Sequence, residues 1–234
     1  MSFEFLAHHS KVALELSGGR DSVAVLYLLR DHLDKITVYW LNTGDAYPET
    51  VTLIDECKEI CPNFVEVKSN VKDWTAVNGY PSDVVPSTGW QVHQPIKVGE
   101  LKLVDAFTCC AHNIMMPLHE RVLADGNTCI IRGQRNSDEY KAPIVSGEWH
   151  DGVQITFPIA DWTDDEVMNF LRAADAPIHP IYYGWHKGVA CLHCTGHWEE
   201  TSLKFLSRHQ QACEFVVTVR DTIDTMVRKR MVSC

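Results

Sequence analysis

Apolar residues in the first third of the chain fall into runs of two kinds. Short runs that are typical of buried strands cover residues 11–16, 36–43 and 64–69. Longer runs that are typical of helices lie between them, at residues 22–33 and after Pro48. This order of strand, helix and strand predicts an α/β fold, a Rossmann-like parallel sheet with helices on both faces.

The rest of the chain is irregular at first and then returns to the same alternation. Residues 73–100 are rich in Gly, Pro, Ser and Trp and show no period, so we expect a long irregular excursion there. Acidic residues that follow Thr163 predict the start of a helix. We expect one α/β domain over residues 1–200 and a helical C-terminal tail over residues 201–234. Further predicted elements are a helix near 114–124 and strands at 128–133 and 153–159.

Composition narrows the class of protein. The chain has 234 residues, 45% of them hydrophobic, which is enough for one substantial core and a small appended subdomain. A formal net charge of −10 argues against broad attraction to nucleic acid or to an anionic membrane and favours a nucleotide. A nucleic-acid acceptor and a homo-oligomer both stay open. The first residues do not resemble a signal peptide and no run approaches about 18 apolar residues, so we expect a cytoplasmic protein with no membrane partner.

The stretch SGGRDS, residues 17–22, joins the first predicted strand to the first predicted helix. Backbone N–H groups at a helix N-terminus favour an anion, and glycines allow the backbone to approach a phosphate closely. The spacing differs from that of the Walker P-loop and from that of the dinucleotide motif G-x-G-x-x-G. The stretch therefore predicts a phosphate cradle of another kind, and a plain glycine turn capped by Asp21 and Ser22 is the alternative.

This stretch resembles the PP-loop of the adenine nucleotide α-hydrolase superfamily. Residues 41–50, LNTGDAYPET, resemble the DTG…FPET segment of a family within it, the phosphoadenosine phosphosulfate (PAPS) reductases, which also includes adenosine phosphosulfate (APS) reductases. The resemblance implies an adenine nucleotide partner, either ATP or APS/PAPS, at the carboxyl ends of the strands. Arg20 would add charge there or point to solvent. The residues implied to bind the nucleotide are Ser17, Gly18, Gly19, Arg20, Asp21, Ser22, Thr43 and Gly44.

A third segment, IRGQRNSDEYKAP at residues 131–143, resembles the family's G-x-R strand end and the basic residue that follows it. Guanidinium groups bind phosphate or sulfate oxygens bidentately. The resemblance therefore implies Arg135 as a contact to the anionic end of the nucleotide, with Arg132 as an equal alternative. Lys141 is the less favoured candidate, because NSDEYK matches the family poorly.

Nine cysteines in a chain expected to be cytoplasmic indicate metal binding or thiol chemistry rather than a disulfide framework. Cys109 and Cys110 are adjacent, and Cys191 and Cys194 form a C-x-x-C pair, so the two pairs can supply four thiolates. Adjacent cysteines suit a 4Fe-4S cluster better than a tetrahedral zinc ion, which is the second candidate. Four unligated core thiols are the third interpretation. The other internal cysteines, Cys57, Cys61, Cys129 and Cys213, are expected in the core.

The segments CCAHNIMMPL and IHPIYYGWHKGVACLHCTG resemble the cluster-binding segments of iron-sulfur APS reductases, which implies a 4Fe-4S cluster on the four thiolates. Two features depart from that family. Asn113 and Ile114 replace an Arg-Lys pair, and the chain lacks the segment E-C-G-I/L-H whose cysteine attacks the sulfate sulfur. Cys234, which follows three basic residues, is a candidate for that nucleophile, and an incidental terminal cysteine is the favoured alternative.

The intact SGG-x-DS loop is typical of relatives that use ATP. This resemblance favours cleavage of ATP between its α- and β-phosphates, which adenylates an acceptor for sulfur transfer, with the cluster carrying or delivering the sulfur and a sulfur donor as a possible partner. Asp21 and Ser22 would position a triphosphate bound to Mg²⁺. One alternative is thiol-dependent reduction of APS or PAPS to sulfite, with Cys234 as nucleophile and a thioredoxin-like reductant. The other is a non-catalytic nucleotide-sensing module.

Overall fold

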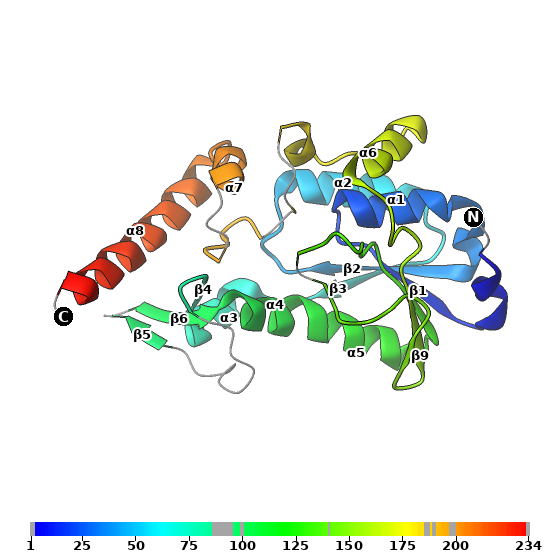
Figure 1. Cartoon of the computed structure of the whole chain (residues 1–234), viewed down its shortest axis with the longest axis horizontal. Coiled ribbons are helices and arrows are strands. Elements are labelled where there is room, and N and C mark those ends of the chain that lie inside the picture. Colours follow the sequence, from blue (N-terminus) through cyan, green and yellow to red (C-terminus); the bar gives the residue numbers. More distant parts are fainter. Residues whose placement is uncertain are drawn as a thin grey trace. The chain divides into compact units, whose positions relative to one another are not determined.

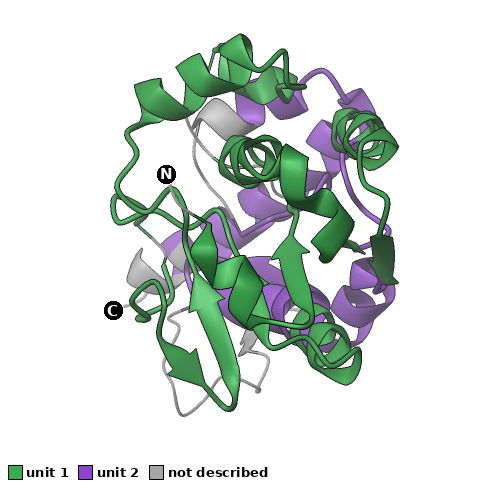
Figure 2. Cartoon of the chain, turned by 90° about the vertical axis from the view of Figure 1, so that its right-hand side faces the viewer, with its two compact units in different colours: residues 1–42, 48–67, 117–189 green, residues 43–47, 68–116, 190–234 purple. Residues whose placement is uncertain are grey.

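The computed structural model describes residues 3–85, 96–98, 101–139, 141–184, 188, 191–196 and 200–232. The chain forms two compact units, each assembled from separate stretches (Figure 2). The domain boundary predicted at residue 200 does not coincide with a division between them, because Ala190–Cys234 belongs to unit 2 throughout. A separately folding tail stays a prediction. Unit 1 comprises Met1–Asn42, Pro48–Val67 and Pro117–Val189, and unit 2 comprises Thr43–Tyr47, Lys68–Met116 and Ala190–Cys234.

Unit 1 is built on a six-stranded sheet of order β3-β2-β1-β7-β9-β8. Strand β1 lies parallel to β2 and β7, strand β7 lies parallel to β9, and β8 is antiparallel at one edge. Leu14 and Ile130 are fully buried, as expected for parallel strands that are covered on both faces. The predicted parallel sheet is therefore confirmed. Its strands are β1 (Val12–Glu15), β2 (Ile36–Asn42), β3 (Phe64–Lys68), β7 (Cys129–Ile131), β8 (Trp149–His150) and β9 (Val153–Thr156).

Helices cover both faces of this sheet, since Figure 1 shows α1, α2 and α6 on one side and α5 on the other. Helix α2 begins at Pro48, as predicted, because the first turn of a helix does not use the N–H that proline lacks. Helix α6 follows Thr163, whose side chain and that of Glu166 cap each other's backbone N–H groups. The bounds are α1 (Arg20–Leu28), α2 (Pro48–Glu59), α5 (Met116–Ala124) and α6 (Asp164–Ala173), with 3-10 helices at Glu4–His8, Arg30–Lys35 and Pro180–Tyr183.

The prediction that residues 73–100 form a long irregular loop is wrong for the part of this range that the structure describes. Most of a helix and two strands fall within that range, and residues 86–95 and 99–100 lie outside the described part. The strands escaped prediction because each is three residues long and is specified by distant pairing, as of Tyr80 with Leu103. The sheet has the order β4-β6-β5. Its elements are α3 (Val71–Asn78), β4 (Tyr80–Ser82), β5 (Ile96–Val98), β6 (Leu101–Asp105) and α4 (Ala106–Cys110), followed by a π-helical turn, Ala111–Met115.

The C-terminal helices of unit 2 are α7 (Glu200–Leu206) and α8 (Gln210–Val232), as predicted. Helix α8 packs on the small sheet, since Val219 and Ile223 form a buried cluster with Leu103. Within the described part of the chain, no helix combines the length and the apolar character that a membrane crossing requires.

Candidate functional site

The SGGRDS stretch forms a tight turn between β1 and the N-terminus of α1. Ser22 closes this turn, because its Oγ accepts from the backbone N–H of Ser17 (3.1 Å) and donates to the carbonyl of Gly19 (2.9 Å). Gly18 has a φ of +82°, and a Cβ there would lie 3.0 Å from Cγ2 of Thr50. The predicted strand-to-helix position of this turn is confirmed. The N-cap of α1 is Gly19 and no side chain caps it, so the capping role of Asp21 and Ser22 in the alternative interpretation is wrong.

Gly133 lies in the segment of residues 131–143 but is not among the predicted site residues. The structure nevertheless requires a glycine at this position. A Cβ at residue 133 would lie 2.6 Å from the backbone carbon of Asp21 and 2.7 Å from the backbone nitrogen of Ser22. Contacts this short are not tolerated between backbone and side chain, so any larger residue would displace one of the two segments. The absence of a side chain therefore lets the segment after β7 lie directly against the first turn of α1.

Two arginines meet beside this turn on one carboxylate. Nη2 of Arg20 lies 2.6 Å and Nη1 of Arg135 lies 2.7 Å from the same oxygen, Oδ1 of Asp164. Both arginine side chains are 5% exposed, so the alternative in which Arg20 points to solvent is wrong. The Arg20 guanidinium also lies over the ring of Tyr182, 5.2 Å from its centroid. Asp164 was predictable only as an acidic residue in the first turn of α6.

Asp21 adds a second carboxylate to this cluster. Its Oδ1 lies 2.9 Å from Nε of Arg135, but neither buried atom makes a hydrogen bond. Burial raises the pKa of Asp21 to about 6, although attraction to Arg135 and then Arg20 opposes this shift. A third carboxylate, that of Asp138, lies 3.6 Å from Nη2 of Arg135. Three carboxylates thus surround two guanidinium groups next to the predicted phosphate cradle.

The other two basic candidates bind protein groups. Arg132 forms a bidentate pair with the half-buried carboxylate of Glu15, at 2.6 and 3.1 Å. Lys141 donates to the backbone carbonyl of Asn136 and is exposed. Of the three predicted contacts to the anionic end of a nucleotide, Arg135 is therefore the one that the structure brings to the SGGRDS turn.

In unit 2, the predicted nucleotide residues Thr43 and Gly44 belong to a turn that contacts cysteine. Oγ1 of Thr43 lies 3.5 Å from Sγ of Cys191, and the Thr43 side chain is buried. Gly44 has a φ of +73°, which the turn requires of its backbone. A nucleotide-binding role for these two residues stays a prediction.

The four cysteines predicted to bind metal all belong to unit 2. Helix α4 carries one pair, and Cys194 closes the turn of the other pair by donating its N–H to the carbonyl of Cys191 (3.1 Å). The two segments adjoin, because a Cβ on Gly196 would lie 2.9 Å from Cβ of Ala106, the first residue of α4. The thiol of Cys191 also packs against the buried cluster that contains Cys109.

Electrostatics supports the same grouping. Burial raises the pKa of Cys109, Cys110 and Cys191, to about 12 for the last two. Coulomb repulsion from Cys194 raises each of these pKa values further. Thiolates placed so close together are unfavourable unless a cation shares them.

No three or more histidine, cysteine, aspartate or glutamate side chains in the described part are arranged to hold a metal ion. A 4Fe-4S cluster takes one thiolate on each of its four irons, whereas zinc needs its ligands to converge on one atom, and the choice between the two stays a prediction.

Asn113 takes the place of a basic residue next to this set. Its Nδ2 donates to the carbonyl of Cys109 (3.0 Å) and lies 3.8 Å from the Cys109 sulfur. The side chain is buried, and its hydrogen bond lowers the pKa of Cys109 against the larger effect of burial. A neutral amide therefore lies near the Cys109 sulfur.

Of the other cysteines, Cys57, Cys61 and Cys129 are buried as predicted, while Cys213 is only half-buried. Cys234 lies outside the described residues, so its predicted role stays a prediction.

The sequence did not identify Asp45 and His193 as partners. Nδ1 of His193 lies 2.7 Å from Oδ1 of Asp45, and the backbone N–H of His193 donates to Oδ2 at 2.9 Å. His193 lies between the two cysteines of the C-x-x-C pair, and Asp45 follows Gly44. The carboxylate of Asp45, in the LNTGDAYPET segment, thus binds the turn between Cys191 and Cys194.

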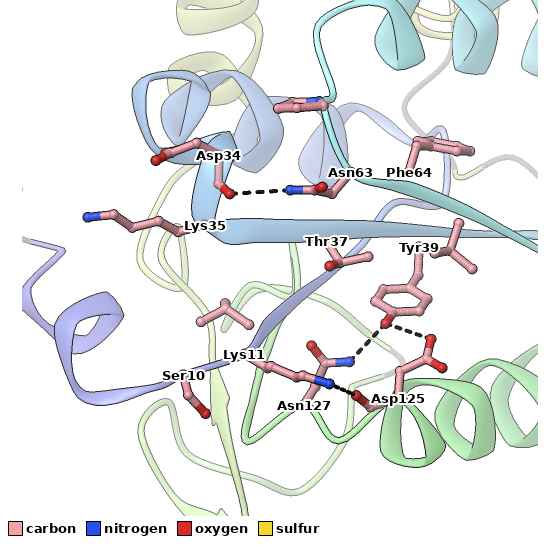
Figure 3. Close-up of a pocket in the computed structure, with 13 residues that line it drawn as sticks. Ser10, Lys11, Asp34, Lys35, Thr37, Tyr39, Asn63, Phe64, Asp125 and Asn127 are labelled. Atoms are coloured by element: carbon pink, nitrogen blue, oxygen red, sulfur yellow. Dashed lines mark hydrogen bonds between the residues drawn. The ribbon is translucent and has the colours of Figure 1, made fainter.

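A pocket of about 680 Å³ lies in unit 1 at the amino ends of β1, β2 and β3 (Figure 3). The Tyr39 hydroxyl donates to Oδ2 of Asp125 and accepts from Nδ2 of Asn127, both at 2.9 Å, and Nζ of Lys11 donates to the Asp125 carbonyl at 2.7 Å. These groups satisfy one another. The SGGRDS turn follows the opposite end of β1, the end at which open parallel sheets bind ligands, so this pocket is not the predicted nucleotide site.

Comparisons with known proteins agree with the fold and with the family that the sequence resembles. The model of the phosphoadenosine phosphosulfate reductase domain matches residues 11–197. An adenosine 5'-phosphosulfate reductase from Burkholderia cepacia is 24% identical over 189 residues, which cover 80% of this chain and 70% of the relative. A phosphoadenosine 5'-phosphosulfate reductase from Xanthomonas euvesicatoria is 28% identical, with 80% and 72% covered. A crystal structure of PAPS reductase from Candida auris, in a phosphate complex, has a TM-score of 0.55 at 12% identity and covers 78% of this chain and 81% of that chain, which supports the fold.

Proposed function

The chain belongs to the phosphoadenosine phosphosulfate reductase family, and from this premise we propose that it is an enzyme that cleaves ATP between the α- and β-phosphates and couples the cleavage to sulfur transfer. The phosphates would lie on the SGGRDS turn at the N-terminus of α1, where backbone N–H groups favour an anion. Gly18 and Gly133 support this placement, because both keep side chains away from the turn.

The charge balance beside the turn is the observation that carries the proposal. Two guanidinium groups, of Arg20 and Arg135, lie among three carboxylates, of Asp21, Asp138 and Asp164. The phosphosulfate group of APS, a dianion without a metal ion, would meet a net negative charge there. Mg²⁺-ATP is also a dianion, but its Mg²⁺ is a cation that the carboxylates attract, so the excess of carboxylates favours a nucleotide that carries a metal ion.

Asp21 would be the carboxylate that faces this ion. Its buried Oδ1 pairs with Nε of Arg135 at 2.9 Å but makes no hydrogen bond, so the carboxylate could accept a further bond from water on a cation. With a pKa of about 6, its carboxyl is ionised at neutral pH, and a nearby Mg²⁺ would lower that pKa. Ser22 would hold the turn in shape through its bonds to Ser17 and Gly19.

In unit 2, Cys109, Cys110, Cys191 and Cys194 would hold a 4Fe-4S cluster. Their grouping and their raised thiol pKa values support this assignment, since a bound cation would relieve the repulsion among thiolates. A bound cluster would supply a redox-active iron-sulfur centre. The reaction would also need a sulfur donor and an acceptor for the sulfur. A nucleic acid could serve as this acceptor.

The second candidate function is thiol-dependent reduction of APS or PAPS to sulfite with a thioredoxin-like reductant. The names of the relatives favour it, since they are APS and PAPS reductases. Cys234 would be its nucleophile, which requires a mobile C-terminus.

The two reactions are separated by their products. Anaerobically prepared protein is given Mg²⁺-ATP with a nucleic-acid acceptor and a sulfur donor, or APS or PAPS with reduced thioredoxin, in parallel, and pyrophosphate and sulfite are both measured. We expect wild type to release pyrophosphate from ATP and Asp21→Asn to lose this release. Asp31→Asn, a matched change at an exposed carboxylate of unit 1, should release pyrophosphate as wild type does. Sulfite formation that requires Cys234, with no pyrophosphate from ATP, would establish the second function in place of the first.

A further inference from the structure

Asp45 makes an unusual number of bonds to the cysteine turn. Its carboxylate accepts from the ring and from the backbone N–H of His193, at 2.7 and 2.9 Å, and its carbonyl accepts from the N–H of Leu192 at 2.7 Å. The Asp45 side chain is 3% exposed. Asp45 belongs to the turn of residues 43–45, called the TGD turn below. It therefore binds both residues between Cys191 and Cys194, which are Leu192 and His193.

The TGD turn itself is held in place by bonds that include the first of these cysteines. The N–H of Asp45 donates to Oγ1 of Thr43 at 3.3 Å, and the same oxygen lies 3.5 Å from Sγ of Cys191. The carbonyl of Thr43 accepts from the N–H of Val71 at 3.1 Å, the first residue of α3. The TGD turn is thus bound to the start of α3 through Thr43, and the Cys191–Cys194 turn is bound to the TGD turn through Thr43 and Asp45.

Lys72 also contacts Asp45, with Nζ 3.3 Å from Oδ1, but this contact is of a different kind. The lysine side chain is 58% exposed, and pairs of that exposure contribute little to stability. Bonds from a buried carboxylate to backbone N–H groups are stronger, and loss of such an acceptor leaves donors unsatisfied. The turn of the cysteine pair should therefore depend on Asp45 and not on Lys72.

We propose that Asp45 is a positioning residue that holds the Cys191–Cys194 turn in the conformation in which both thiols face the other cysteine pair, so that the set is ready for a cluster. This inference rests on the proposed function for the cluster itself. The geometric part, that Asp45 fixes the turn, stands without a cluster and can be tested without one.

The first test measures the turn in the metal-free chain. Rates of alkylation of the individual cysteines by iodoacetamide are followed by peptide mass spectrometry in wild type, Asp45→Asn and Asp45→Ala. Both variants remove the same charge, but asparagine keeps an acceptor oxygen and alanine does not. We expect Asp45→Ala to alkylate Cys191 and Cys194 about tenfold faster than wild type and severalfold faster than Asp45→Asn, with the rates of Cys109 and Cys110 unchanged.

Two controls separate the turn from its surroundings. Lys72→Met removes the exposed contact to the same carboxylate, and Asp221→Asn removes an exposed carboxylate of α8 in the same unit. Both should alkylate as wild type does. Equal rates for Asp45→Asn and Asp45→Ala would overturn the proposal, because charge alone would then explain the change. A parallel rise at all four cysteines would also overturn it, because Asp45 would then stabilise the unit as a whole.

The second test measures iron and acid-labile sulfide per chain and the electron paramagnetic resonance spectrum after anaerobic reconstitution. We expect Asp45→Ala to retain less than half the iron of wild type, Asp45→Asn to be intermediate, and Lys72→Met to be unchanged. Wild-type iron content and an unaltered spectrum in Asp45→Ala would overturn the positioning role. A wild-type chain that takes up no iron while the alkylation pattern holds would instead remove the cluster and leave the turn-fixing role in place.

Discussion

Arg20 and Arg135 contact the same oxygen atom, Oδ1 of Asp164, at 2.6 and 2.7 Å. The two arginines come from the first turn of α1 and from the segment after β7, and the carboxylate begins α6. Three elements of unit 1 are therefore joined at one atom beside the predicted phosphate cradle. Each guanidinium is buried and Asp164 is half-exposed, so Asp164 is the most exposed carboxylate of the cluster.

Asp164→Asn should have opposite effects on stability and on anion binding. Loss of the shared charge should lower the free energy of unfolding by about 1–2 kcal/mol, a value reduced by the exposure of Asp164. The same loss should tighten the binding of metal-free ATP severalfold, since one negative charge leaves the cluster. Urea denaturation and calorimetric titration measure the two effects. Asp165→Asn, an exposed neighbour in the same turn, is the control, and equal results for both variants would contradict the prediction.

Asp21 should make unit 1 less stable as pH rises from about 4 to about 6. Its pKa is raised from 3.8 to about 6 by burial, so in this window the folded chain keeps a proton that the unfolded chain releases. The stabilisation from the protonated carboxyl is fully present below the unfolded pKa and is lost as pH passes the folded pKa. Asp21→Asn mimics the protonated form and should gain about 2–3 kcal/mol at pH 7 while losing pyrophosphate release.

Urea denaturation of wild type and Asp21→Asn at pH 4 and at pH 7 measures this effect. The difference between the two chains should be small at pH 4 and large at pH 7. Asp31→Asn, which changes an exposed carboxylate, should follow wild type at both values. A constant difference between Asp21→Asn and wild type at the two pH values would show that the Asp21 carboxyl does not titrate in this window.

Local signals in the sequence were sufficient for much of the fold. Proline at the start of α2 and the capping box at Thr163 act within a few residues, so the helices of unit 1 could be located. The buried apolar runs located the parallel strands for the same reason. The small sheet of unit 2 could not be predicted, because strands of three residues carry no period and Tyr80 is matched to Leu103 across a long stretch of chain.

The residues of the candidate site also fall into those that local sequence signals predict and those that only the fold brings together. The SGGRDS turn was predictable because glycine turns and helix starts are local, and the cysteines were found because residue type alone marks them. The partners of these groups were not found. Asp164 meets Arg20, and Asp45 meets His193, only because the fold brings distant segments together. An aspartate has no sequence signal that tells a buried ion pair from a solvated surface charge.

Gly133→Ala should destabilise unit 1 because the new methyl would lie 2.6 Å from the backbone of Asp21. We expect a loss of about 1–3 kcal/mol in the free energy of unfolding, together with weaker ATP binding from displacement of the first turn of α1. Gly184→Ala is the matched control, because no atom of the described residues, its chain neighbours apart, lies within 4 Å of a Cβ there. Thermal and urea denaturation give the stability, and unchanged stability in Gly133→Ala would refute the close approach of the two segments.

Arg132 and Arg135 should separate into a structural and a binding arginine. Arg132 is bidentate to Glu15, whose side chain is 13% exposed, so Arg132→Met leaves a largely buried carboxylate without its partner. We expect Arg132→Met to lower the free energy of unfolding by about 1–2 kcal/mol and to leave the dissociation constant for Mg²⁺-ATP within about twofold of wild type.

Arg135→Met removes the guanidinium that lies on Asp21 and Asp164 and should weaken Mg²⁺-ATP binding by about tenfold or more. Arg121→Met, which breaks an exposed pair within α5 and its following turn, is the control and should change neither quantity measurably. Equilibrium binding and urea denaturation on the three variants give both quantities. If Arg132→Met weakens nucleotide binding more than Arg135→Met does, Arg132 would leave Glu15 to contact the nucleotide, and the assignment of the two arginines would be reversed.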